Sequence, residues 1–209
     1  MNNFDSVAGF YDKLATLVFG TAMRRAQTTY LYDIPQGSNV LILGGGTGWL
    51  LSELSAVNPT CKVWYIDASS QMISLSKRKM RNSTHEIVFI HGTEESIPVE
   101  IMFDAVITNF YLDLFPPDSC NVTIRKIRSA SRTGGLWLVS DFINTTWWHG
   151  VMLRMMYGFF RLMCGTEGNS LSPWKNLLEE NGFKEHKSRE FFGGFIKSAV
   201  FRINLLKEK

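Results

Sequence analysis

The sequence predicts an α/β fold built on a doubly wound, mostly parallel sheet of seven strands. Apolar runs near residues 40, 63 and 86 alternate with segments of helical pattern, and the runs 103–108 and 136–141 continue the series. Such alternation is typical of parallel strands joined by helices that cover both faces of the sheet. Near the end of the chain, 185–191 and 195–203 flank Phe192-Gly-Gly194, which predicts an antiparallel hairpin.

The remaining elements follow in order along the chain. A helix over about 7–30, within an N-terminal helical segment of residues 1–34, precedes the first strand. A helix over 118–131 leads through Gly134-Gly135 into the strand 136–141, and an apolar helical insertion over 143–170 separates that strand from the hairpin. A hydrophobic fraction of 45% in 209 residues is enough for one well-buried core, so we expect one domain, 1–209.

A glycine loop after the first strand is the strongest local signal. The apolar run that ends at Leu43 is followed by Gly44, Gly46 and Gly48, which would let the main chain approach a ligand closely. A helix predicted to start at Thr47 would point its free N–H groups at that ligand. Asp67 closes the next apolar run, at the spacing where a carboxylate accepts hydrogen bonds from ribose hydroxyls. The pattern indicates a nucleoside site.

Trp49 distinguishes between classes of nucleoside ligand. Dinucleotide-binding folds place a third glycine at this position, where the helix packs beneath the pyrophosphate. An indole at Trp49 disfavours a pyrophosphate and favours a ligand with a small zwitterionic tail. The loop also lacks the Gly-Lys-Ser/Thr sequence of P-loop nucleotide triphosphatases.

Residues 40–48 resemble the first motif of class I S-adenosylmethionine-dependent methyltransferases, and the similarity extends through most of the chain. The resemblance implies a Rossmann-like fold, with S-adenosylmethionine as the cofactor. It also implies that the glycine loop packs on the methionine part of the cofactor and that Asp67 holds the ribose. The candidate cofactor-binding residues are Tyr11, Gly44, Gly45, Gly46, Thr47, Gly48, Asp67, Ala68, Met72, Thr93, Glu94 and Asn109.

Several of these assignments depend on single positions of the resemblance. Met72 lies where the family has an apolar contact to the adenine, and Thr93 replaces an aspartate beside the adenine amino group. Asn109, at the end of the fourth strand, lies where the cofactor and substrate pockets meet. The family usually has an acid two residues before the first glycine, where this chain has Ile42. Tyr11, in a segment that resembles quinone-pathway methyltransferases, is a candidate to support the cofactor instead.

The segment 147–163 is the second informative feature. On a helix it is apolar around most of its circumference, but Arg154 and Arg161 interrupt it, and it is too short to span a bilayer. Three roles stay open. It could be a lid over an apolar substrate pocket, a helix in peripheral contact with a membrane surface, or a helix packed against the core or the second subunit of a homodimer.

The candidate substrate-binding residues are Tyr111, Asp141 and Trp148, which lie near strand ends or on the apolar segment. Asp113 and His149 lie in the same regions, but loop capping and packing account for them equally well, so no catalytic base is assigned. Methyl transfer requires alignment and exclusion of water, and it needs a base only when the nucleophile starts protonated. Asn109-Phe110-Tyr111 is similar to the Asn-Pro-Pro-Tyr of amino-group methyltransferases but lacks both prolines.

The sequence therefore favours a methyltransferase that acts on a small, apolar or aromatic molecule by in-line transfer. The alternatives are a methyltransferase-like binding module without turnover and an NAD-dependent oxidoreductase. A net charge of +3 without a dense basic tract argues against a nucleic acid partner. The three cysteines form no pair with metal-ligand spacing, and the first residues lack the pattern of a signal peptide, so we expect no metal and a cytoplasmic location.

Overall fold

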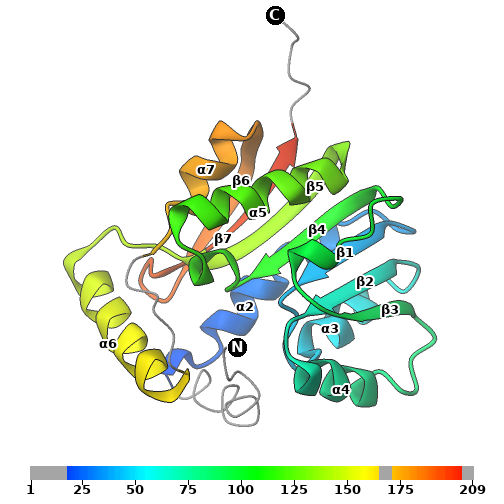
Figure 1. Cartoon of the computed structure of the whole chain (residues 1–209), viewed down its shortest axis with the longest axis horizontal. Coiled ribbons are helices and arrows are strands. Elements are labelled where there is room, and N and C mark those ends of the chain that lie inside the picture. The colour runs from blue at the N-terminus through cyan, green and yellow to red at the C-terminus, as the bar shows by residue number, and fades with distance from the viewer. Residues whose placement is uncertain (1–17, 165–170, 204–209) are drawn as a thin grey trace, which may run out of the picture.

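The computed structural model describes residues 18–164 and 171–203, which form a twisted seven-stranded sheet with helices on both faces (Figure 1). The strands are β1 (Asn39–Leu43), β2 (Lys62–Asp67), β3 (Glu86–His91), β4 (Phe103–Asn109), β5 (Ser131–Phe142), β6 (Phe183–Phe191) and β7 (Ile196–Ile203). The α-helices are α2 (Ala22–Thr28), α3 (Trp49–Val57), α4 (Ser70–Lys79), α5 (Pro117–Ala130), α6 (Trp147–Cys164) and α7 (Trp174–Glu180). Short 3-10 turns are η2 (Leu31–Asp33), η3 (Glu94–Ser96) and η4 (Leu112–Leu114).

The strand order is β3-β2-β1-β4-β5-β7-β6. Strands β1 to β5 are parallel to one another, and β7 lies antiparallel between β5 and β6. The predicted fold class is thereby confirmed: an α/β fold with a Rossmann-like, mostly parallel sheet and a C-terminal antiparallel hairpin. The chain reverses its direction of winding between β1 and β4, and open α/β sheets bind ligands beyond the carboxyl ends of the strands at such a point.

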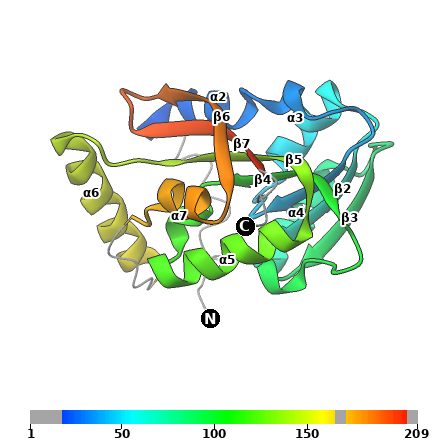
Figure 2. The same ribbon diagram turned by 90° about the horizontal axis from the view of Figure 1, so that it is seen from above.

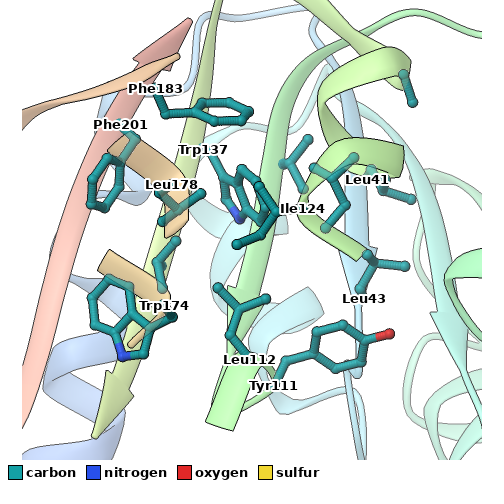
Figure 3. Packing of buried hydrophobic residues seen from close by; sticks show 14 of the residues in the cluster. Leu41, Leu43, Tyr111, Leu112, Ile124, Trp137, Trp174, Leu178, Phe183 and Phe201 are labelled. Carbon is teal, nitrogen blue, oxygen red and sulfur yellow. The ribbon is translucent and has the colours of Figure 1, made fainter. Parts of the chain in front are cut away.

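Two apolar layers hold the helices on the sheet. On one face, Leu51, Leu54 and Ile73 of α3 and α4 pack on alternate residues of β1 and β2. On the other, Ile124 of α5 and Leu178 of α7 pack around Trp137 of β5, as Figure 3 shows. The indole of Trp137 is fully buried, and its Nε1–H donates to Thr108 Oγ1 at 2.9 Å. Central strands are therefore buried on both faces, which explains their continuous apolar runs.

Helix α6 departs from this layered arrangement. Figures 1 and 2 show it beyond the end of β5, on the side of the turn that joins β6 to β7. Its inner side packs through Leu153, which is 5% exposed. Its outer side exposes Trp147, Val151 and Met155, one turn apart. None of the helices among the described residues is long and apolar enough to cross a membrane.

Two predicted boundaries differ from the structure. The strand expected over 136–141 already begins at Ser131, because Gly134 and Gly135 form a bulge inside the strand rather than a loop before it. The register passes from Phe103↔Ser131 to Ala105↔Leu136, so residues 132–135 bulge out opposite one residue of β4. Of the helix expected over 7–30, the structure describes only the part from residue 18, and Tyr11 lies outside the described residues.

Candidate cofactor and acceptor site

The strand register brings the sequence-predicted residues into one row at the carboxyl edge of the sheet. Leu43 pairs with Ile66 on one side and with Thr108 on the other, which places Gly44 between Asp67 and Asn109. Asp67 pairs with His91, and Asn109 pairs with Ser140. Residues more than forty positions apart in the chain therefore meet at one edge.

The glycine loop owes its shape to backbone angles that other residues rarely adopt. Gly44, Gly46 and Gly48 have φ values of 65°, 65° and 74°. A Cβ on Gly45 would lie 2.1 Å from the Tyr65 ring, so this position is closed to any side chain. Helix α3 begins at Trp49, two residues after the predicted start at Thr47, because Gly48 takes the N-cap position in the left-handed conformation.

Polar contacts from β2 and α4 fix the middle of the loop. The Tyr65 hydroxyl and the Ser76 hydroxyl both donate to the carbonyl of Gly46, at 2.8 and 2.9 Å. The N–H of Gly46 donates to Asp67 Oδ2 at 2.8 Å. Sequence reasoning missed Tyr65 and Ser76. A lone hydroxyl inside a buried apolar strand was the available signal for Tyr65, because a buried tyrosine usually has a hydrogen-bond partner.

Asp67 points into the loop rather than outward. It is 9% exposed, and its Oδ1 accepts the N–H of Ser69 at 2.9 Å. The Ser69 hydroxyl in turn accepts the N–H of Met72 at 3.1 Å and caps α4. Ala68 lies between them, and its carbonyl is 3.1 Å from His91 Nε2. One carboxylate thus fixes both the glycine loop and the segment expected to flank an adenine.

Tyr111 closes the other side of the loop. A Cβ on Gly44 would lie only 2.6 Å from the Tyr111 ring, and Tyr111 is 8% exposed. The Tyr111 hydroxyl donates to Glu94 Oε2 at 2.9 Å. Burial and the neighbouring Glu94 carboxylate raise the pKa of Tyr111 well above its usual range, so the phenol stays protonated. Thr93, which accepts the N–H of Glu95, shapes the turn that presents Glu94.

The end of β4 carries two unusual features. The side-chain Nδ2 of Asn109 is buried without a hydrogen-bond partner among the described residues. Phe110 follows with a φ of 51°, a left-handed conformation that is uncommon for a bulky residue. Its N–H donates to Ser140 O at 2.7 Å, which holds this backbone in place. Unsatisfied and strained groups of this kind concentrate at binding sites.

An aromatic cluster lies beside this strand end. The Phe110 and Phe142 rings are 4.8 Å apart, and Phe142 lies 4.9 Å from Phe195. We define the aromatic cluster as Phe19, Phe110, Phe142, Trp148, Phe192 and Phe195. These rings come from α6, three strand ends or turns, and the residues before α2, so they form an apolar wall that no single sequence segment encodes.

His149 attaches α6 to the hairpin. The ring is fully buried, and its Nδ1 accepts the N–H of Thr145 at 3.2 Å. Nε2 therefore carries the proton and donates to Gly193 O at 3.3 Å. The Trp148 ring lies against the same glycine, 3.1 Å from where its Cβ would be. These contacts give His149 a positioning role.

Asp141 and Asp113 form a buried carboxyl pair behind the site. Asp141 accepts the N–H groups of Leu112 at 3.1 Å and Phe142 at 2.8 Å, and it shapes the turn η4. Asp113 Oδ1 is buried with no partner among the described residues. Burial raises the pKa of Asp113 to about 7, and burial together with Asp113 raises that of Asp141 well above its usual value. Contact between Asp141 and a substrate stays a prediction.

Comparisons with known proteins agree with this geometry. Residues 40–135 match the sequence profile of the methyltransferase domain family. The chain is 28% identical to the malonyl-[acyl-carrier protein] O-methyltransferase of Priestia megaterium over 179 residues, which cover 85% of this chain and 62% of that enzyme. It is 24% identical to the demethylmenaquinone methyltransferase of Geobacillus stearothermophilus over 204 residues, 95% of this chain and 84% of the relative.

A solved structure shares the fold. The 1,6-didemethyltoxoflavin-N1-methyltransferase of Burkholderia thailandensis superimposes with a TM-score of 0.71 at 16% identity, over 96% of this chain and 86% of that one. That likeness shows the fold. The family profile over residues 40–135 and the named relatives support a class I S-adenosylmethionine-dependent methyltransferase, and they do not favour the oxidoreductase or the binding module left open by the sequence.

Proposed function

We propose that this enzyme methylates a small, apolar or aromatic acceptor that lies between the glycine loop and the aromatic cluster. The observation that carries the proposal is the shared edge: Gly44, Asp67 and Asn109 lie in one row, and the aromatic cluster begins at the next residue, Phe110. S-adenosylmethionine supplies a methyl group already activated by its sulfonium centre. The protein's task is then alignment and exclusion of water, for which an apolar wall is suited.

The residues present fit this cofactor. Gly46 has no described atom within 4 Å of its missing Cβ, so the loop leaves space at its tip. A carboxylate accepts up to about four hydrogen bonds, so ribose hydroxyls can share Asp67 with the backbone amides it already holds. The unpartnered Nδ2 of Asn109 offers a donor at the junction with the acceptor. We assign the cofactor contacts to the glycine loop, Asp67, Ala68, Met72, Thr93, Glu94 and Asn109.

Two of the proposed acceptor residues differ in how they can act. Trp148 belongs to the aromatic cluster and offers a ring face to an apolar molecule. Tyr111 lies against Gly44 and bonds to Glu94, so we propose that it separates the cofactor from the acceptor and keeps water out. With its pKa raised by burial and by Glu94, this phenol can donate a hydrogen bond but is a poor general base.

Calorimetric titration with S-adenosylmethionine or S-adenosylhomocysteine tests the cofactor site. Asp67→Ala should weaken binding by about 1 to 3 kcal/mol, the scale for loss of hydrogen bonds to a charged group. Asp104→Ala is the matched control, because Asp104 also accepts a backbone N–H, that of Asn39 at 2.9 Å, but at the opposite edge of the sheet. It should leave affinity unchanged. Absence of saturable heat with the wild-type enzyme, or equal losses in both variants, would contradict the proposal.

The acceptor class is tested by product formation. The two relatives above are named for malonyl-[acyl-carrier protein] and for demethylmenaquinone. We propose a small apolar or aromatic acceptor, and no nucleic acid. A screen of quinone precursors, phenols, fatty acids and amines for release of S-adenosylhomocysteine should give turnover with one of the apolar groups. Turnover confined to nucleic acid or to amino-acid side chains of proteins would overturn it.

The setting of the enzyme is proposed from its surface and thiols. Cys61 and Cys120 are free and buried, which suits a reducing cytoplasm. The row Trp147, Val151 and Met155 on α6 supports peripheral contact with a membrane surface or with a second copy. Co-sedimentation with liposomes and size-exclusion chromatography distinguish the two, and a monomer that ignores liposomes would contradict both.

A further inference from the structure

A groove of about 590 Å³ opens between the first turns of α6 and the residues that lead into α7. Phe142 belongs both to its lining and to the aromatic cluster. Among the residues that the structure describes, none of those assigned to cofactor binding lines the groove. The groove therefore continues the acceptor side of the molecule rather than the cofactor side.

The inner part of the groove is apolar. Phe142, Leu153 and Trp174 line it, and all three are buried. The indole N–H of Trp174 donates to Phe142 O at 3.1 Å, so its one polar atom is satisfied and its ring presents apolar surface. A wall of this kind suits a hydrocarbon or aromatic body.

The outer part carries positive charge. Arg154 and Lys175 line the groove, and none of the lining residues that the structure describes is acidic. Lys175 is held by Glu185 at 3.2 Å, so much of its charge is already balanced. Arg154 is exposed and makes no ion pair with any carboxylate that the structure describes. A guanidinium of this kind is suited to a planar or tetrahedral anion.

A buried hydroxyl adds a second polar group. Ser172 is 1% exposed and lines the groove. The Cys120 thiol lies beside its Oγ, but no described residue makes a well-formed hydrogen bond with that oxygen. A thiol is a weak hydrogen-bond partner, so this buried hydroxyl keeps hydrogen-bonding capacity for a ligand or for water.

We propose that this groove binds an amphipathic anion, with the apolar body against Phe142, Leu153 and Trp174 and the anionic group at Arg154. The inference rests on the proposed function in one respect: the ligand is the methyl acceptor, so the acceptor carries a carboxylate, sulfonate or phosphate group remote from the methylated atom. Small neutral aromatics would then be poor acceptors compared with their acidic counterparts.

A pair of fluorescent probes tests the groove without knowledge of the acceptor. Anilinonaphthalene sulfonate and its uncharged parent N-phenylnaphthylamine share an aromatic body and differ in one anionic group. The sulfonate should bind the wild-type enzyme more tightly than the parent. Arg154→Gln should lower the affinity for the sulfonate probe about tenfold, as expected for the loss of one charged hydrogen bond. It should change the affinity for the uncharged parent by less than about twofold.

Two glycines of α6 provide a matched steric test. A Cβ on Gly150 would face the groove with only Asn144 nearby, at 3.8 Å, whereas one on Gly158 would meet no described atom within 4 Å. Gly150→Leu should fill the groove and weaken both probes at least about fivefold, while Gly158→Leu, with the same gain in helix propensity, should change neither. Equal effects of the two leucine variants, or equal affinity for the two probes, would overturn the proposal.

Titration of the same variants with S-adenosylmethionine separates the two hypotheses. If the variants bind S-adenosylmethionine as the wild type does, and the two probes bind with equal affinity, the groove proposal is wrong and the proposed function stands. Absence of cofactor binding would defeat the proposed function, whatever the probes do. Thermal melts of each variant verify folding, and Lys175→Gln, which affects a lysine already paired with Glu185, should weaken the sulfonate less than Arg154→Gln.

Discussion

The two halves of the sheet edge are built in different ways. At β1 and β2, the proposed cofactor half consists of backbone: three glycines at positive φ and one carboxylate that accepts the N–H groups of Gly46 and Ser69. At β4, β5 and the β6–β7 turn, the acceptor half consists of side chains, the aromatic cluster above all. A site made of backbone is encoded by a short, recognisable sequence. A site made of packed rings depends on where distant segments meet.

The halves meet where the Tyr111 ring from the β4 side fills the space beside Gly44. This contact couples a side-chain wall to a backbone loop. A substitution at Gly44 should therefore also displace Tyr111, and the first experiment tests this.

Gly44→Ala should have the largest effect on stability. Gly44 and Gly46 both have a φ of 65°, but a Cβ on Gly44 would lie 2.6 Å from Tyr111, whereas one on Gly46 meets nothing within 4 Å. Backbone strain with overpacking predicts a loss of about 2 to 4 kcal/mol for Gly44→Ala, and strain alone about 1 to 2 kcal/mol for Gly46→Ala. Urea unfolding measures both. Equal losses would show that Tyr111 moves aside freely and that the halves are not coupled.

Asp113→Asn should have an intermediate effect that depends on pH. The pKa of Asp113 is raised from 3.8 to about 7 by burial. The folded protein therefore holds a proton that the unfolded chain releases above pH 4, and stability falls as pH rises through this window. The variant removes the part of this dependence that Asp113 contributes, while buried Asp141 keeps its own. It should be more stable than wild type by roughly 1 to 3 kcal/mol at pH 8, with little difference near pH 4. Melting curves across this range measure it, and parallel pH profiles for the two proteins would contradict the assignment.

The left-handed phenylalanines should show the smallest effect. Phe110 and Phe192 both have a φ of 51°, and Phe115 has a φ of −104°. At Phe110 and Phe192, the glycine variant of the protein should be more stable than the alanine variant by about 1 kcal/mol, because only glycine adopts this conformation without strain. At Phe115 the alanine variant should be the more stable one. Glycine relieves no strain there and only increases the conformational entropy of the unfolded chain. Denaturation of the six variants measures the differences, and the same order at all three positions would refute strain at β4.

The sequence predicts the geometry of the proposed cofactor half well for a physical reason. The loop from Gly44 to Gly48 and the acid at Asp67 are each set by local backbone requirements, so their spacing is visible in the chain. The alternation of elements predicted a doubly wound, mostly parallel sheet with an antiparallel end, and the structure confirms it. The start of β5 was wrong because Gly134-Gly135 reads as a loop but forms a bulge within a paired strand.

The acceptor half could not be derived in the same way. The contact of Tyr111 with Glu94, that of Asp113 with Asp141, and the aromatic cluster join segments through tertiary packing. None has a spacing that a linear pattern reveals. The groove beside Arg154 depends on the angle at which α6 leaves the sheet, which His149 fixes through a contact with a residue 44 positions away.

The three hydrogen bonds at Gly46 have a further consequence. Its amide is held by Asp67 and its carbonyl by Tyr65 and Ser76, so the bend of the loop exists before any small molecule arrives. Binding of the cofactor then costs little conformational entropy of the loop, so the affinity can come almost entirely from direct contacts. We expect S-adenosylmethionine to bind to a glycine loop that is already rigid. The aromatic side chains opposite the loop would then adjust to different methyl acceptors.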